Sequence, residues 1–319
     1  MAKKKPELKE VKEEPPKQDP KKITEVDCFI PCHFVDWNYF GSNIRAMLDE
    51  IPIKTLFVGC NNPTNGYIND LRSSLSKYDK IEFVDQRGIK TLGMQIVDLM
   101  KRCQTEFFVF CHADARPRRH SFLVLEADML IPDPNDDRKA GIVESDRVQY
   151  PYENPRDFPT EYPYYYYRER SFSGYQLFRK EAVEHFFDKI EDDYIYRNED
   201  IIWQNVCEAN GYCYVKSSGM HVHTCSNVNH QWTPQGVELT PKEARALTFD
   251  MQVKGLVKYC VPTELAVNAW RDAIGICIAE NGIDLWEFID GYIKETNPKW
   301  VEPIKKVIVD LLRYYVWRR

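Results

Sequence analysis

The sequence predicts an α/β fold with a doubly wound central sheet, helices on both faces and a helical C-terminal extension. Between residues 27 and 111, short apolar segments and segments of helical period alternate four times, as in the parallel half of such a sheet. The segment 107–111 is apolar at every position, and a strand without alternation is usually buried on both faces. The last third of the chain is helical in period.

The first half of the chain is interpreted as four strands separated by three helices. The strands are expected at residues 27–31, 54–58, 81–84 and 107–111. The helices are expected at residues 43–51, 68–78 and 92–102, with a turn at residues 60–66. Arg116 and Pro117 are expected to stop the fourth strand, because proline interrupts the hydrogen bonds of a sheet.

The middle of the chain is less regular. From residue 132 to residue 173, prolines punctuate a long stretch that is dense in tyrosine and carries one short strand, at 140–144. A strand at 175–178 and a helix at 180–187 follow it. A second helix at 201–207 is expected to end at Gly211, and a last strand at 212–215 leads to His221 and His223.

The C-terminal third predicts four helices. Thr240-Pro241 opens the first, with the pattern of a capping box. Thr263 starts the second, which is expected to end at Gly282. The last two are expected at residues 285–294 and 302–317, and the final one carries a continuous apolar stripe.

Composition excludes several classes of function. The chain has 319 residues, 43% of them apolar, and its net charge of -6 argues against a general nucleic-acid binder. None of the ten cysteines lies in a Cys-x-x-Cys pair, so we expect reduced thiols in a cytoplasmic protein. No apolar run predicts a membrane helix or a signal peptide, and the charged residues 1–24 predict a disordered tail.

Three polar clusters follow strands or open helices. Asp114 follows the strand at 107–111, where it is expected to project into a crevice; a carboxylate there can hold a cation, and the cation a diphosphate. Glu199 with Asp200, and His221 with His223, form the other two clusters. Each alone also fits a structural role, such as carboxylates stabilising the start of a helix. Their order along the chain favours a common site.

On these residues the chain resembles the family-2 glycosyltransferases of the GT-A fold. Phe29-Ile30-Pro31 is similar to the first strand of that family. Residues 107–117 are similar to its Asp-x-Asp strand, with His-Ala-Asp at 112–114, and residues 173–182 to its acceptor-side segment.

The second half of the resemblance lies around Asp200. Asn198-Glu199-Asp200 with Trp203 is similar to the Glu-Asp helix of the family, and Gly211-Tyr212 to the Gly-Tyr after it. His223 lies near the position of a histidine found in many members. The resemblance implies a Rossmann-like, mixed sheet, with a GT-A domain at 25–235 and a helical extension at 236–319.

The resemblance also implies a reaction: transfer of a sugar from a UDP- or GDP-linked donor to an acceptor hydroxyl. Asp114 and His223 would hold a divalent cation, Mn²⁺ or Mg²⁺, with His112 assisting at the metal or at the nucleotide. Asp200 would be the general base of an inverting transfer, and Glu199 would position or cap.

Further contacts with the nucleotide are expected from Pro31, Asn61, Asn62 and Lys90, and Arg87 could add another. The chain departs from the family pattern in two places. His112 replaces the first Asp of Asp-x-Asp, and Gly59 to Asn62 replace an acidic turn near the nucleotide.

Three other readings of the sequence stay open. A retaining glycosyltransferase would share the metal site, and His112 leaves room for a binding module without catalysis. A sugar nucleotidyltransferase would need a Gly-rich basic loop at the position that residues 32–36 occupy.

The acceptor could be a glycan or a lipid-linked hydroxyl lying against the tyrosine-rich segment. The basic, aromatic end of the last helix suits peripheral contact with a membrane.

Overall fold

The computed structural model describes residues 22–32, 37–60, 65–87, 89, 92–131, 136–149, 174–187, 199–223, 253–281 and 285–317. Several predictions lie outside these residues: most of the charged tail, the tyrosine-rich segment at 150–173, the helix predicted at Thr240, and the nucleotide contacts Asn61, Asn62 and Lys90. For Glu199 and His223 the backbone is described but the side chains are not.

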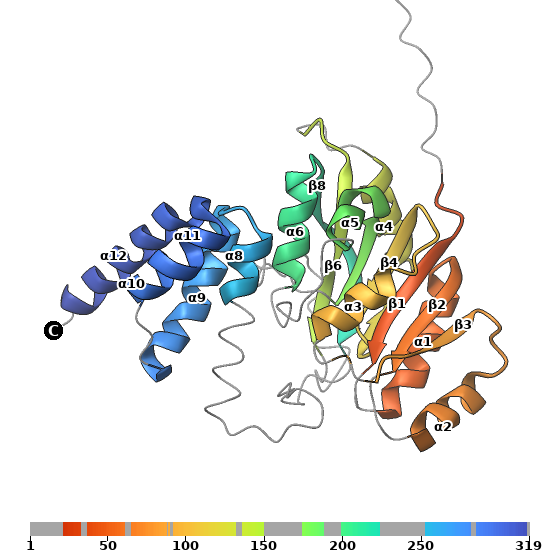
Figure 1. Ribbon diagram of the computed structural model, residues 1–319. Coiled ribbons are helices and arrows are strands. Elements are labelled where there is room, and N and C mark those ends of the chain that lie inside the picture. The colour runs from red at the N-terminus through yellow and green to blue at the C-terminus, as the bar shows by residue number, and fades with distance from the viewer. Residues whose placement is uncertain are drawn as a thin grey trace, which may run out of the picture.

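Eight strands of the described chain form one sheet, in the order β3-β2-β1-β4-β7-β6-β8-β5 (Figure 1). They are β1 (Val26–Cys32), β2 (Ile53–Cys60), β3 (Ile81–Asp85), β4 (Phe107–Cys111), β5 (Ala115–Pro117), β6 (Ala140–Gln149), β7 (Tyr175–Arg179) and β8 (Cys213–His223). The first four strands run parallel, and β6 and β8 also pair in parallel. Because β7 and β5 run antiparallel to their neighbours, the sheet is mixed and mostly parallel.

Helices cover both faces of this sheet and give it two apolar cores. Helices α1 (Trp37–Glu50), α2 (Asn65–Leu75) and α4 (Ser121–Leu130) contribute to the core on one face. Helices α3 (Leu92–Met100), α5 (Lys180–Phe187) and α6 (Glu199–Ala209) contribute to the core on the other. Strand β1 is buried at all seven positions, which is why its sequence lacks polar alternation.

The helical extension packs against α6, at the end of the molecule opposite α2 and β3 (Figure 1). It contains α8 (Gly255–Tyr259), α9 (Glu264–Asn281), α10 (Leu285–Phe288), a π-helical turn (Ile289–Ile293), α11 (Lys294–Thr296), a 3₁₀ turn (Pro298–Trp300) and α12 (Val301–Trp317). Its buried Trp270 and Trp300 belong to the same apolar core as Trp203 of α6. None of the helices in the described ranges is both long and apolar enough to cross a membrane.

The structure confirms most predicted elements and corrects several. Gly211 has φ of 85° just beyond α6, and the Thr263 hydroxyl accepts a hydrogen bond from the Ala266 N–H in the first turn of α9, as their sequence patterns indicate. The eight cysteines whose side chains the structure describes are free and buried. In contrast, α2 begins at Asn65, inside the predicted turn, and Ile23 is buried although it lies within the tail predicted to be disordered.

The sequence interpretation missed β5 and α4. Pro117 does not stop the sheet but belongs to β5, a three-residue strand at the sheet edge, where a missing N–H removes no ladder bond. Helix α4 carries apolar residues around most of its circumference, so it shows no helical stripe. It packs on β6 and β8, strands whose true length was also underestimated.

Candidate active site at the carboxyl edge of the sheet

Several chain segments bring polar groups to one edge of the sheet. Parallel strands β1, β2 and β4 end there at Cys32, Cys60 and Cys111. Helix α6 leads through a short turn into β8 and packs against it, so the helix begins at the edge where β8 ends. In open α/β sheets this is the edge at which ligands bind.

The turn that carries His112 and Asp114 is held from two sides. The backbone N–H of His112 donates to the Gly174 carbonyl at 2.9 Å, which ties the turn to the start of β7. On the other side, Asn43 Nδ2 of α1 donates to the Ala113 carbonyl at 3.0 Å. Arg116 Nε donates in turn to Asn43 Oδ1 at 3.2 Å. The Asn43 amide is fully buried, so these bonds fix the turn firmly.

Asp114 does not lie in an open crevice, contrary to the sequence prediction, because the residue is only 6% exposed. Its neighbour Ala115 pairs with His223 in the β5–β8 ladder. The backbone of the predicted second ligand therefore lies beside that of the first, although the two residues are more than a hundred positions apart. Among the side chains that the structure describes, no group of three His, Cys, Asp or Glu residues could hold a metal ion.

His112 and the start of α6 share one face of the sheet. The His112 ring lies edge-on to the Phe110 ring, with centroids 5.3 Å apart. The Phe110 ring also contacts the Trp203 ring, with centroids 5.7 Å apart. Trp203 lies one helical turn after Asp200, so the predicted base and the predicted nucleotide ligand are both neighbours of one aromatic cluster.

Asp200 occupies a half-buried position at the start of α6. Burial raises the pKa of its carboxyl to about 6, and the backbone N–H of Ile201, which donates to Asp200 Oδ1 at 2.9 Å, opposes the rise. The positive charge of Lys216 on β8 also opposes it. A carboxylate with this pKa is mostly ionised at neutral pH and can still accept a proton.

His221 supports the structure rather than contributing to an open site. It is fully buried, and its Nδ1 lies 2.7 Å from the hydroxyl of Ser145. That hydroxyl donates to the Tyr175 carbonyl at 2.8 Å, so Nδ1 must be the donor of the first bond. A Cβ added to Gly174 would lie 2.2 Å from His221 Nε2, which explains why glycine precedes β7.

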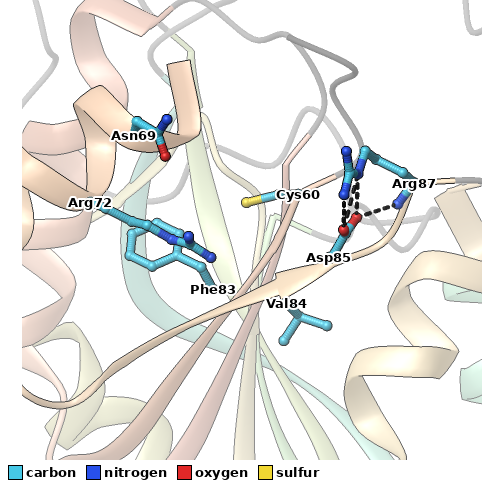
Figure 2. A pocket seen from close by; sticks show the side chains of 7 residues that line it. All are labelled: Cys60, Asn69, Arg72, Phe83, Val84, Asp85 and Arg87. Atoms are coloured by element: carbon cyan, nitrogen blue, oxygen red, sulfur yellow. Dashed lines mark hydrogen bonds and ion pairs between the residues drawn. The ribbon is translucent and has the colours of Figure 1, made fainter. Parts of the chain in front are cut away.

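A pocket of about 220 Å³ opens at the carboxyl ends of β2 and β3 (Figure 2). It is lined by Cys60, Asn69, Arg72, Phe83, Val84, Asp85 and Arg87. The Arg72 guanidinium lies over the Phe83 ring, 5.4 Å from its centroid.

Asp85 and Arg87 form an ion pair at one side of this pocket, and Figure 2 shows Cys60 between them and Arg72. Arg87 Nε donates to both carboxylate oxygens, at 2.9 and 3.0 Å, and holds the pKa of Asp85 at about 2. Asp85 pairs with Cys60 in the β2–β3 ladder. Sequence reasoning named Arg87 but missed Asp85, although a polar residue at the end of a strand is the signal that singled out Asp114.

The remaining predicted site residues lie in less informative places. Pro31 is buried in β1 and pairs with Gly59 of β2, one residue before each strand ends. A Cβ on Gly59 would lie 2.1 Å from Gln86 Oε1, so β2 and the segment after β3 approach each other closely. Glu199 opens α6 beside Asp200.

Comparison with known proteins identifies the fold. No family model matches the chain, and no curated protein matches it by sequence. The mannosyltransferase PcManGT from Pyrobaculum calidifontis, solved with GDP-Man and Mn²⁺, matches at a TM-score of 0.50 and 12% identity, over 93% of this chain and 90% of that one. TarS residues 1–349 from S. aureus, solved with UDP-GlcNAc, matches at 0.49 and 10% identity, over 89% and 80%. At such identities the likeness shows the fold alone: an α/β GT-A fold with a mixed, mostly parallel sheet.

Proposed function

We propose that this chain is a glycosyltransferase that moves a sugar from a nucleotide-diphosphate donor to an acceptor hydroxyl. The proposal depends on one observation: the turn that carries His112 and Asp114 lies at the same sheet edge as the start of α6, where Asp200 has a raised pKa, and the rings of His112 and Trp203 both contact Phe110. The turn offers ligands that suit a cation and a diphosphate, and Asp200 suits proton removal. PcManGT, which shares the fold, was solved with GDP-Man and Mn²⁺.

The residues at the turn fit a divalent cation. Asp114 offers carboxylate oxygens and His112 an imidazole, and the Ala115–His223 pair brings the backbone of a second histidine beside them. Oxygen with imidazole nitrogen is a donor set that Mn²⁺ or Mg²⁺ accepts, with nitrogen favouring Mn²⁺. A cation held there would neutralise the charge that develops on the departing nucleoside diphosphate.

Asp200 would act as the general base. Its carboxylate would take the proton of the acceptor hydroxyl while that oxygen bonds to the anomeric carbon of the sugar and the bond from this carbon to the diphosphate breaks. Attack from the side opposite the leaving group inverts the anomeric centre. Glu199, the preceding residue, would position the acceptor or cap the helix.

The base of the nucleotide would lie at the pocket of Figure 2, whose lining includes Cys60, the residue that precedes Asn61 and Asn62 in the sequence. Uracil and guanine both carry a ring N–H, and a carboxylate such as that of Asp85 can accept a hydrogen bond from it. The Arg72 guanidinium offers a flat cationic surface. Pro31, Lys90 and His112 stay predictions as further contacts, as do a glycan or lipid-linked acceptor, peripheral membrane contact through α12 and a cytoplasmic location.

Thermal unfolding of the full chain with a panel of nucleotide sugars, with Mn²⁺, Mg²⁺ or EDTA, tests the function. A ligand that binds only the folded state raises the unfolding temperature, so one donor should do so in the presence of cation and lose most of the effect in EDTA. No shift with any donor, together with no transfer of labelled sugar, would favour a binding module without catalysis. The anomeric configuration of the product separates inversion from retention.

A further inference from the structure

Helix α6 is packed on two opposite faces. Towards the sheet, Trp203 contacts the rings of Phe110 and Phe178, at 5.7 and 5.9 Å. Away from the sheet, α6 contacts α8 and α9 of the helical extension. The helix that begins with Asp200 therefore forms a middle layer, and its position depends on both neighbours.

The contact with the extension is made through a buried amide. Asn205 is 3% exposed, and its Nδ2 donates to the Val261 carbonyl at 3.0 Å and to the Thr263 hydroxyl at 3.1 Å. The Val261 N–H donates back to Asn205 Oδ1 at 3.1 Å. One side chain thus satisfies both backbone groups of Val261, in the manner of a neighbouring strand. Buried groups of this kind are costly to leave unpaired, so the register between α6 and the extension is well defined.

We propose that Asn205 is a positioning residue: it docks the helical extension on α6 and thereby holds Asp200 in its place at the sheet edge. This inference rests on the proposed function, because it assigns the extension a part in that site. Asn205 lies five positions after Asp200, and a helical segment of that length, about 7.5 Å, transmits a displacement without bending. Loss of the Asn205 bonds would let α6 tilt and let water reach its first turn.

The distinguishing consequence concerns proton transfer. If the extension no longer holds α6, the carboxyl of Asp200 becomes more hydrated, and its pKa falls towards the ordinary range. Lys216 of β8 is the neighbouring charge that already lowers this pKa, and it stays in place in the variant. A loss of packing elsewhere would reduce stability without moving the pKa.

The experiment compares Asn205→Leu with Asn210→Ala in the full chain. Asn210 follows the same helix at its far end, where its Nδ2 donates to the Ala182 carbonyl of α5 at 2.9 Å. For Asn205→Leu we expect kcat to fall at least tenfold, the donor KM to stay within about twofold, and the acidic limb of the kcat profile to move to lower pH. Amide exchange across Glu199–Ala209 should also become faster. Asn210→Ala should retain the wild-type kcat, profile and exchange.

Equal behaviour of the two variants in kcat, profile and exchange would overturn the proposal. If Asn205→Leu does not fold, Thr263→Val decides: it removes one acceptor of the Asn205 amide, together with the capping bond from the Ala266 N–H, and keeps both bonds between Asn205 and Val261. It should shift the same readouts in the same direction by a smaller amount, and an unchanged profile and exchange would refute the positioning role. If the wild-type chain transfers no sugar from any donor, the proposed function fails, and the exchange of α6 with an NMR titration of Asp200 still decides the positioning.

Discussion

The regions around Asp85 and Asp200 lie at the same edge of the sheet but place a carboxylate in opposite surroundings. Asp85 is exposed, ends an outer strand and is held by a guanidinium, so its pKa lies at about 2. Asp200 is half-buried at the start of α6, and burial raises its pKa to about 6. The first keeps its charge at every physiological pH, whereas the second can gain and lose a proton.

On the proposed function, this difference separates recognition of the donor from proton transfer. The permanently charged Asp85, with its partner Arg87, suits hydrogen bonding to the polar edge of a bound ligand. A carboxyl with a raised pKa, such as that of Asp200, suits a general base. The two ends of the molecule in Figure 1 are then expected to respond to different experiments: the α2–β3 end to changes of donor, and the α6 end to changes of pH.

The largest expected effect follows from removing the base. Asp200→Asn keeps the shape of the side chain but cannot accept the proton, so kcat should fall about 100-fold to 10,000-fold. Donor binding, measured by thermal shift, should stay nearly unchanged. Glu208→Gln, which alters a carboxylate near the other end of α6, is the matched control and should retain activity. If the Asp200→Asn variant keeps nearly the wild-type kcat, Asp200 is not the general base, and the proposed difference in role between Asp85 and Asp200 is wrong.

The next effect concerns the cation. Asp114→Ala removes the buried carboxylate of the turn, and we expect the cation-dependent part of the donor thermal shift to disappear while the shift in EDTA persists. Asp136→Ala, which breaks an ion pair with Arg138 at the surface, provides a control for loss of an acidic residue. If Asp114→Ala binds the donor with wild-type dependence on Mn²⁺, the cation is held elsewhere.

Stability should depend on pH with opposite signs at the two sites. Because the folded chain raises the pKa of Asp200 from 3.8 to about 6, it binds more protons than the unfolded chain in this range, and its stability falls as the pH rises through it. Asp200→Asn should therefore be more stable than wild type at pH 7, by about 3 kcal/mol. The gain should vanish below the pKa of Asp200 in the unfolded chain.

Asp85→Asn should instead be slightly less stable than wild type above pH 4, a difference that is lost as the pH falls towards about 2. Urea unfolding at several pH values measures both.

The smallest expected effect lies at the pocket. Arg72→Ala removes the guanidinium over Phe83 and should raise the donor KM about fivefold with kcat unchanged, because one such cationic surface contributes about 1 kcal/mol. Lys77→Ala is the control, since Lys77 lies over the Tyr78 ring, just beyond α2, and does not line the pocket. Equal KM values for the two variants would place the nucleotide base elsewhere.

The sequence predicts the parallel half of this fold well, because each of its elements is defined by a local pattern. Strands β1 and β4 are apolar at nearly every position, and Leu92–Met100 has a clear helical period. The mixed half is predicted less well. β5 is a strand only because Ala115 pairs with His223, far along the chain, and no local pattern encodes that pairing.

The site divides in the same way. Asp114 is singled out in the sequence by its place after a strand, and Asp200 by its place at the start of a helix. Their burial cannot be predicted from the sequence, since it depends on which segments pack around them. Asp85 beside Cys60 and Asn205 beside Val261 depend on register and docking between distant segments. Asn205 is of a type that is ordinary for surface positions, so the sequence contains no signal that distinguishes it, whereas Asp85 carries the strand-end signal that singled out Asp114.

The short strand β5 also has a consequence for association between molecules. A sheet edge with free N–H and C=O groups can recruit the strand of another chain and begin aggregation. Here one edge strand has only three residues and contains Pro117, which cannot donate to a neighbour. The other, β3, exposes the charges of Glu82 and Asp85. Both edge strands therefore resist strand addition, which opposes polymerisation of a protein with a large, apolar sheet.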